Sequence, residues 1–85
     1  MQNYYVYILK CRDETLYTGI AVDVEKRVAA HNTKKTAAAY TKARRPVSLI
    51  YSEIVENRSE ALKREYAIKQ LSREQKLDLM RTQQT

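Results

Sequence analysis

The longest uninterrupted apolar segment of the 85-residue chain is short, and its composition is that of a β-strand. It runs from Tyr4 to Leu9 and consists of tyrosine, valine, isoleucine and leucine. Six residues are far fewer than the roughly 20 that a membrane-spanning helix requires, and β-branched and aromatic side chains favour strands. The segment therefore predicts a strand over residues 4–10, buried on both faces of a sheet, in a protein with no membrane span.

Turn and cap residues divide the rest of the chain into short elements. A polar segment at residues 11–14 separates the first strand from further β-type residues, which predicts a hairpin. Helix N-caps are expected at Asp23, Asn57 and Ser72, the last paired with Gln75 in a capping box. The pattern predicts strands at 4–10, 15–20 and 47–55, helices at 23–32, 57–71 and 73–81, and an aperiodic loop at 32–46.

The resulting order, β-β-α-β-α-α, predicts an α/β fold with a small, largely antiparallel sheet. A chain of 85 residues has room for one domain, and we expect its core within residues 4–71. The C-terminal helix at about 73–81 carries Leu77 and Met80 as a short apolar stripe, which either caps this core or binds a partner.

Positive charge is concentrated in one part of the chain. Between residues 26 and 52 there are seven basic and no acidic residues, whereas the remainder carries a net charge of −1. A block of this kind indicates a polyanionic partner such as a nucleic acid. The lone Cys11 excludes an internal disulfide, and with no secretory signal pattern the chain is typical of a cytoplasmic protein.

A carboxylate falls on the predicted apolar face of the helix at 57–71. The apolar arc of that helix consists of Ala61, Leu62, Tyr66 and Ile68. Glu65 projects inside the arc, and an unpaired buried carboxylate costs several kcal/mol, so a cation is expected beside it. That cation is either a metal ion or a side chain at the rim of the core, such as Lys69 or Arg58.

The helix at 23–32 carries a second polar pair. Arg27 and His31 lie four residues apart, which places them on one side of the helix. Either they bind the same anion, or Arg27 is solvated and His31 interacts only with the negative end of the helix dipole.

All seven aromatic residues are tyrosines, so each buried ring brings a hydroxyl group that needs a partner. Tyr7 on the first strand and Tyr17 on its hairpin mate are expected on the same side of the sheet. They serve either as packing at the sheet edge or as phenols that face a polar cleft.

The predicted loop at 32–46 combines charge with hydroxyl groups and one aromatic ring. Its basic residues are Lys34, Lys35, Lys42, Arg44 and Arg45. With the hydroxyl of Thr41 they are expected to hold phosphates, while Tyr40 stacks on an unpaired base. The alternative is a solvated basic loop.

Two short motifs connect these separate features. Two triplets, Tyr5-Val6-Tyr7 and Tyr17-Thr18-Gly19, are separated by nine residues. Together they resemble the two-part signature of the GIY-YIG nuclease superfamily. Arg27 and His31 follow at the spacing of that family's helix, and Glu65 resembles its metal-binding glutamate. The resemblance spans residues 4–71 and is strongest to the small stand-alone bacterial members. It implies a three-stranded antiparallel sheet flanked by helices.

The resemblance also implies a function. Glu65 would bind one Mg²⁺ or Mn²⁺ ion, Arg27 would stabilise the transition state of phosphodiester hydrolysis, and Tyr7 or Tyr17 would act as general base with His31 as a proton relay. The expected activity is metal-dependent cleavage of DNA, structure-selective, in repair or recombination. By the same resemblance, Gly19 is the structural glycine of the second motif.

The chain departs from the family signature at three positions, because Tyr5 replaces its first glycine and Val6 and Thr18 replace its isoleucines. The alternative function is therefore a catalytically inert nucleic-acid-binding module of the same fold. No separate recognition domain fits into 85 residues, so specificity is expected from the cleft, the loop or a protein partner.

Overall fold

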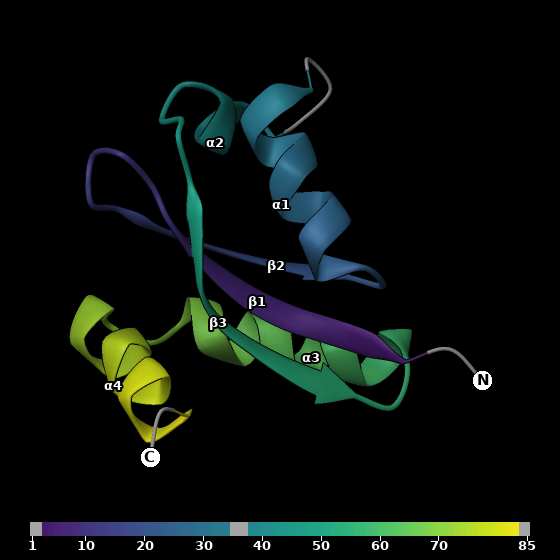
Figure 1. The fold of residues 1–85 in the computed structure, drawn as a ribbon. Helices are drawn as coiled ribbons and strands as arrows, with labels where there is room; N and C mark the ends of the chain where they lie inside the picture. The colour runs from purple at the N-terminus through teal and green to yellow at the C-terminus, as the bar shows by residue number, and fades with distance from the viewer. Residues whose placement is uncertain (1–2, 35–37, 84–85) are drawn as a thin grey trace.

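The computed structural model describes residues 3–34 and 38–83 and confirms the predicted α/β fold (Figure 1). Its helices lie on both sides of one small sheet. The elements are β1 (Tyr4–Lys10), β2 (Leu16–Ala21), α1 (Val24–Thr33), α2 (Ala39–Lys42), β3 (Ser48–Val55), α3 (Arg58–Lys69) and α4 (Arg73–Gln83). In the described part of the chain, no helix has the length and hydropathy needed to cross a membrane.

The sheet is three-stranded and antiparallel, in the order β2-β1-β3, as expected. β1 and β2 form the predicted hairpin, in which Tyr7 pairs with Gly19. β1 also pairs with β3, with Ile8 opposite Tyr51 and a register shift directly after Ile8. The first strand of the chain therefore becomes the central strand of the sheet.

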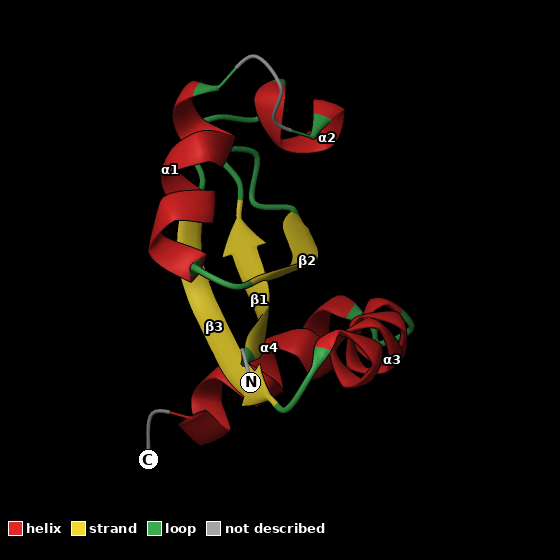
Figure 2. Ribbon diagram, turned by 90° about the vertical axis from the view of Figure 1, so that its right-hand side faces the viewer, coloured by secondary structure: helices red, strands yellow, loops and turns green. Residues whose placement is uncertain are grey.

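The two faces of β1 pack against different helices, so the prediction of burial on both faces is confirmed. Tyr7 and Leu9 belong to a cluster on the α1 side that includes Val24 and Val28. Val6 and Ile8 belong to a second cluster, with residues of α3 and α4. Figure 2 shows α1 and α3 on opposite sides of the sheet.

The three predicted helix caps are present. The carboxylate of Asp23 and the side-chain oxygen of Asn57 each accept a hydrogen bond from the backbone three residues on, at 3.0 and 2.9 Å. Ser72 and Gln75 exchange the two bonds of a capping box, at 2.9 and 3.2 Å. Local hydrogen bonding therefore sets where α1, α3 and α4 begin.

Two predictions about local structure are wrong. The segment at 32–46 is not all loop, since Ala39–Lys42 form the one-turn helix α2. On α3, Leu62 and Tyr66 are 39% and 69% exposed, whereas Ala61 and Ile68 are buried. The helix has few apolar residues, so contact with the sheet, rather than its own pattern, decides which side is covered.

Candidate active site

Tyr7 crosses the face of β2 because Gly19 has no side chain. A β-carbon on Gly19 would lie 2.5 Å from the hydroxyl oxygen of Tyr7 and 2.7 Å from the adjacent ring carbon. Both distances are too short for non-bonded atoms, so glycine is required opposite Tyr7. The ring of Tyr7, which is 1% exposed, is thereby directed from the central strand toward the edge strand.

The hydroxyl group of Tyr7 meets His31, which comes from the last part of α1. The Tyr7 oxygen lies 2.9 Å from Nε2 of His31, and the two rings are arranged edge to face. His31 is buried. Burial raises the pKa of the Tyr7 phenol, and burial together with the positive charges of Arg27 and Arg45 lowers the pKa of His31. At neutral pH the proton therefore stays on the tyrosine and the imidazole is neutral.

Tyr17 borders the same group of rings. Its ring centroid lies 5.2 Å from that of His31, edge to face, and 5.9 Å from that of Tyr40, nearly parallel. Tyr17 is half-buried, so one predicted phenol is buried and the other reaches the surface. Both are held against His31.

The charges of Arg27 and Glu65 both act on the Tyr7 hydroxyl. Burial has the largest effect on the pKa of Tyr7 and raises it, and the neighbouring Tyr17 raises it further. Smaller effects come from Arg27, which lowers this pKa, and from Glu65, which raises it. Arg27 comes from α1 and Glu65 from α3, on opposite sides of the sheet. The structure brings Tyr7, Tyr17 and His31 into direct contact, whereas Arg27 and Glu65 are related to them only through their charges.

Glu65 lies on the covered side of α3, with a side chain that is 19% exposed, and its carboxylate oxygen is 3.4 Å from Nζ of Lys69. The side-chain partner predicted from the sequence is therefore present. Within residues 3–34 and 38–83 no group of three or more histidine, cysteine or acidic side chains is placed to hold a metal ion. A single carboxylate does suit Mg²⁺, which usually keeps several waters and binds substrate phosphate as well.

A groove of about 520 Å³ runs between α1 and the beginning of α3. Three cationic side chains line it, those of Lys26, Arg27 and Arg58, together with one acidic side chain, that of Asp23. The rest of the lining is uncharged and consists of Tyr4, Ile20, Ala21, Val22 and Ala30. The sequence pattern predicts Arg58 only as a partner for Glu65 and predicts no separate role for Lys26. The sequence does carry a signal for Lys26, which lies beside Arg27 in the block without acidic residues.

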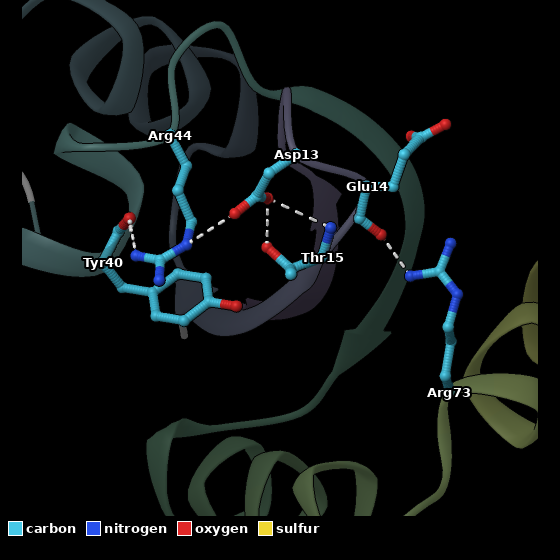
Figure 3. Close-up of polar contacts among 6 residues, drawn as sticks. All are labelled: Asp13, Glu14, Thr15, Tyr40, Arg44 and Arg73. Atoms are coloured by element: carbon cyan, nitrogen blue, oxygen red, sulfur yellow. Dashed lines mark hydrogen bonds and ion pairs between the residues drawn. The ribbon is translucent and has the colours of Figure 1, made fainter.

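Arg44 is bound within the protein, as Figure 3 shows. Its Nε donates to the carboxylate of Asp13 at 2.9 Å, another guanidinium nitrogen donates to the carbonyl of Tyr40 at 3.0 Å, and the guanidinium lies 3.9 Å from the centre of the Tyr40 ring. Arg44 and Tyr17 contact the ring of Tyr40, which remains 37% exposed, so stacking of Tyr40 on an unpaired base stays a prediction.

Figure 3 also shows a contact between the hairpin and the C-terminal helix. The guanidinium of Arg73, at the start of α4, donates to the backbone carbonyl of Glu14. The turn between β1 and β2 is thus held by Arg44 on one side, through Asp13, and by Arg73 on the other.

Two further residues of the predicted phosphate-binding loop have structural partners. Arg45 donates to the backbone carbonyls of His31 and Lys34, so it satisfies the C-terminal end of α1. Thr41 is fully buried, and the prediction that its hydroxyl contacts phosphate is wrong. Lys34 and Lys42 are exposed, and the predicted contact Lys35 lies outside the described residues.

Comparison with known proteins supports the resemblance. The model of the GIY-YIG catalytic domain matches residues 3–78. A UPF0213 protein of Staphylococcus saprophyticus is 55% identical over 80 residues, covering 94% of this chain and 96% of its own, and one of Syntrophus aciditrophicus is 53% identical over 81 residues, covering 95% and 93%.

Two solution NMR structures are similar to this fold. A UPF0213 protein from Bacillus halodurans superimposes with a TM-score of 0.59 at 40% identity, covering 94% of this chain and 84% of that one. A protein from E. faecalis gives a TM-score of 0.65 at 38% identity, covering 96% and 86%.

Proposed function

The chain belongs to the GIY-YIG catalytic domain family, and on that premise we propose that it hydrolyses phosphodiester bonds in DNA with the help of one Mg²⁺ or Mn²⁺ ion. The observation that carries the proposal is the convergence on one phenol. The Tyr7 oxygen lies 2.9 Å from His31 Nε2 and within the electrostatic influence of Arg27 and Glu65. His31 Nε2 is therefore placed to take the Tyr7 proton.

Tyr7 is the proposed general base. Its pKa is raised by burial, so it does not ionise freely, but His31 is within reach to take its proton. The Tyr7 hydroxyl is buried in the free protein, so DNA binding must first open a path for water to it. As water then attacks phosphorus, the proton of the water passes to the Tyr7 oxygen and the Tyr7 proton passes to His31 Nε2. A P–O bond to the attacking oxygen forms while the P–O bond to the leaving strand breaks.

Arg27 and Glu65 have complementary proposed roles. Arg27 is exposed at the groove and would donate to the phosphate oxygens as negative charge develops on them. Glu65 would hold the metal ion through its carboxylate, with Lys69 displaced from its present ion pair. The bound ion would supply charge neutralisation at the phosphate and at the leaving oxygen.

The groove between α1 and α3 is the proposed path of the nucleic acid. Lys26, Arg27 and Arg58 line it, so it offers positive charge that continues from the proposed catalytic arginine. Lys34 and Lys42 extend the positive surface beyond the C-terminal end of α1. Contacts of this kind read backbone charge and shape, so we propose structure-selective cleavage in repair or recombination, with sequence choice left to a protein partner.

The test is cleavage of branched, nicked and single-stranded DNA in Mg²⁺ and in Mn²⁺. Tyr7→Phe and Glu65→Gln should each lower the rate by at least about 100-fold, whereas Glu60→Gln, on the same helix and partly exposed, should leave it unchanged. Circular dichroism should show the same fold in all three variants. Undiminished cleavage by Glu65→Gln would overturn the mechanism.

The ion pair between Glu65 and Lys69 favours a second candidate function, an inert nucleic-acid-binding module, because the carboxylate already has a partner. This candidate predicts salt-dependent DNA binding without cleavage in either metal ion, and unchanged binding in Glu65→Gln.

A further inference from the structure

A chain of three hydrogen bonds runs through the interior from β1 to α2. The Tyr7 oxygen lies 2.9 Å from His31 Nε2, His31 Nδ1 lies 2.8 Å from Thr41 Oγ1, and Thr41 Oγ1 lies 3.0 Å from the carbonyl oxygen of Ala38. Tyr7, His31 and Thr41 are 1%, 3% and 0% exposed. Because the groups are buried, each proton in the chain needs an acceptor within it.

The direction of the chain follows from counting protons. The carbonyl oxygen of Ala38 has no proton to give, so the hydroxyl proton of Thr41 is donated to it. Thr41 Oγ1 then accepts from His31, which places the imidazole proton on Nδ1. A neutral imidazole carries one proton, so Nε2 is bare and accepts the hydroxyl proton of Tyr7.

The opposite direction satisfies fewer groups. If Thr41 donated to Nδ1, the imidazole proton would lie on Nε2 and point at the Tyr7 oxygen. The hydroxyl proton of Tyr7 would then lack any recorded acceptor among residues 3–34 and 38–83, and the Ala38 carbonyl would lose its bond from Thr41. A buried donor without a partner costs more than a bond is worth when made.

The surroundings of His31 keep its imidazole neutral. The groups that face His31 are Tyr7 from β1, Tyr17 from β2, Thr41 from α2, Arg27 from α1 and Arg45 from the segment before β3. None is a carboxylate, and the two arginines disfavour a second positive charge beside them.

We propose that Thr41 is a positioning residue that holds His31 in the Nδ1–H tautomer and so directs the free electron pair of Nε2 at the Tyr7 hydroxyl. The effect on cleavage rests on the proposed function, whereas the tautomer itself does not. The proposal also gives α2 a role, because this one-turn helix places the fully buried Thr41 beside Nδ1 of His31.

The tautomer is measured directly by NMR of the ¹⁵N-labelled full-length protein, without DNA or metal. His31 is the sole histidine in the sequence, so its two ring nitrogens need no assignment by mutation, and their ¹⁵N shifts distinguish a protonated from a bare nitrogen. In the wild type we expect a protonated Nδ1 and a bare Nε2. A protonated Nε2 would overturn the proposal.

Two variants test the part played by Thr41. Because the Tyr7 hydroxyl also favours a bare Nε2, both variants are made in a Tyr7→Phe background. There Thr41→Val keeps the shape but removes the acceptor of the Nδ1 proton, and should move the ring shifts toward the Nε2–H form. Thr41→Ser keeps a hydroxyl and should retain the shifts of the Tyr7→Phe protein. Unchanged shifts in a folded Thr41→Val protein would contradict the proposal.

With Tyr7 intact, the two Thr41 variants link the tautomer to catalysis. Thr41→Val should lower kcat by at least about tenfold with little change in the KM for DNA, and Thr41→Ser should restore most of it. If the wild type shows the Nδ1–H form and cleaves no DNA, the proposed function fails and the tautomer assignment stands. If the wild type cleaves DNA but carries a protonated Nε2, the proposed function stands and the tautomer assignment fails.

Discussion

The hydroxyl oxygen of Tyr7 lies 2.5 Å from the point that a β-carbon on Gly19 would occupy. Two residues paired across the hairpin therefore depend on each other, one by its size and the other by having no side chain. The φ angle of Gly19 is not positive, so the backbone conformation does not itself require glycine. The requirement is steric, because any other residue at this position would clash with the ring of Tyr7.

Gly19→Ala should displace Tyr7 from His31 and destabilise the protein. Tyr7 is buried and cannot swing aside freely, so we expect a loss of about 1–3 kcal/mol in the free energy of unfolding, measured by urea titration. In a Tyr7→Leu background the same change should cost much less, because leucine does not extend over position 19. Equal costs in the two backgrounds would show that the contact with Tyr7 is not the cause.

Thr18→Val should stabilise the protein. The side-chain oxygen of Thr18 is buried and has no hydrogen-bond partner among the residues that the structure describes. Replacing this hydroxyl by a methyl group of similar size should raise the free energy of unfolding by about 1 kcal/mol. Thr15→Val is the matched control, since the Thr15 hydroxyl donates to Asp13 at 2.6 Å, and it should not stabilise. A lower midpoint for Thr18→Val would contradict the prediction.

Protonation of Asp13 should weaken the hairpin turn at acid pH. The hydroxyl of Thr15, followed by its backbone N–H and by Arg44, lowers the pKa of Asp13 in the folded protein. A carboxyl group with a lowered folded pKa stabilises the fold above its unfolded pKa of about 3.9, and this stability is lost as the pH falls through the folded value.

The measurement is urea unfolding at pH 7 and at about pH 3 for the wild type and Asp13→Asn. The wild type should lose more stability than the variant between the two pH values. Other carboxylates contribute to both proteins alike, so the difference isolates Asp13. Parallel losses would mean that the carboxylate of Asp13 is no better stabilised in the folded chain than in the unfolded one.

Lys26 and Arg58 should contribute to nucleic-acid binding through charge. If both contact phosphates, replacing both by alanine should lower the slope of log affinity against log salt by about 1.4 for single-stranded DNA. Replacing Lys63 and Arg81, whose side chains are exposed and do not line the groove, changes the net charge equally. That control should leave the slope nearly unchanged, and an equal effect of both double variants would argue against a defined path along the groove.

Local signals in the sequence were sufficient for most of the fold. The strands at 4–10 and 47–55, the hairpin and all three N-caps were predictable because each depends on residues a few positions apart. The pair Glu65–Lys69 was predictable for the same reason, being one helical turn apart.

The partners of the loop residues could not be predicted, because they come from distant parts of the chain. Arg44 binds Asp13, 31 residues away, and Thr41 binds His31, 10 residues away. No periodicity distinguishes an arginine that binds a carboxylate inside the protein from one that faces solvent. The loop therefore looked like a phosphate-binding surface, although several of its polar groups hold the site together.

The central position of β1 affects how the chain acquires its structure during synthesis. Ile8 pairs with Tyr51, so on the ribosome β1 is made before the strand that covers one of its edges. At roughly 5–20 residues per second the delay is about 2–9 seconds. β2 follows β1 at once and protects the other edge as a hairpin. Until β3 is made, that hairpin is the nascent chain's main defence against aggregation through the apolar first strand.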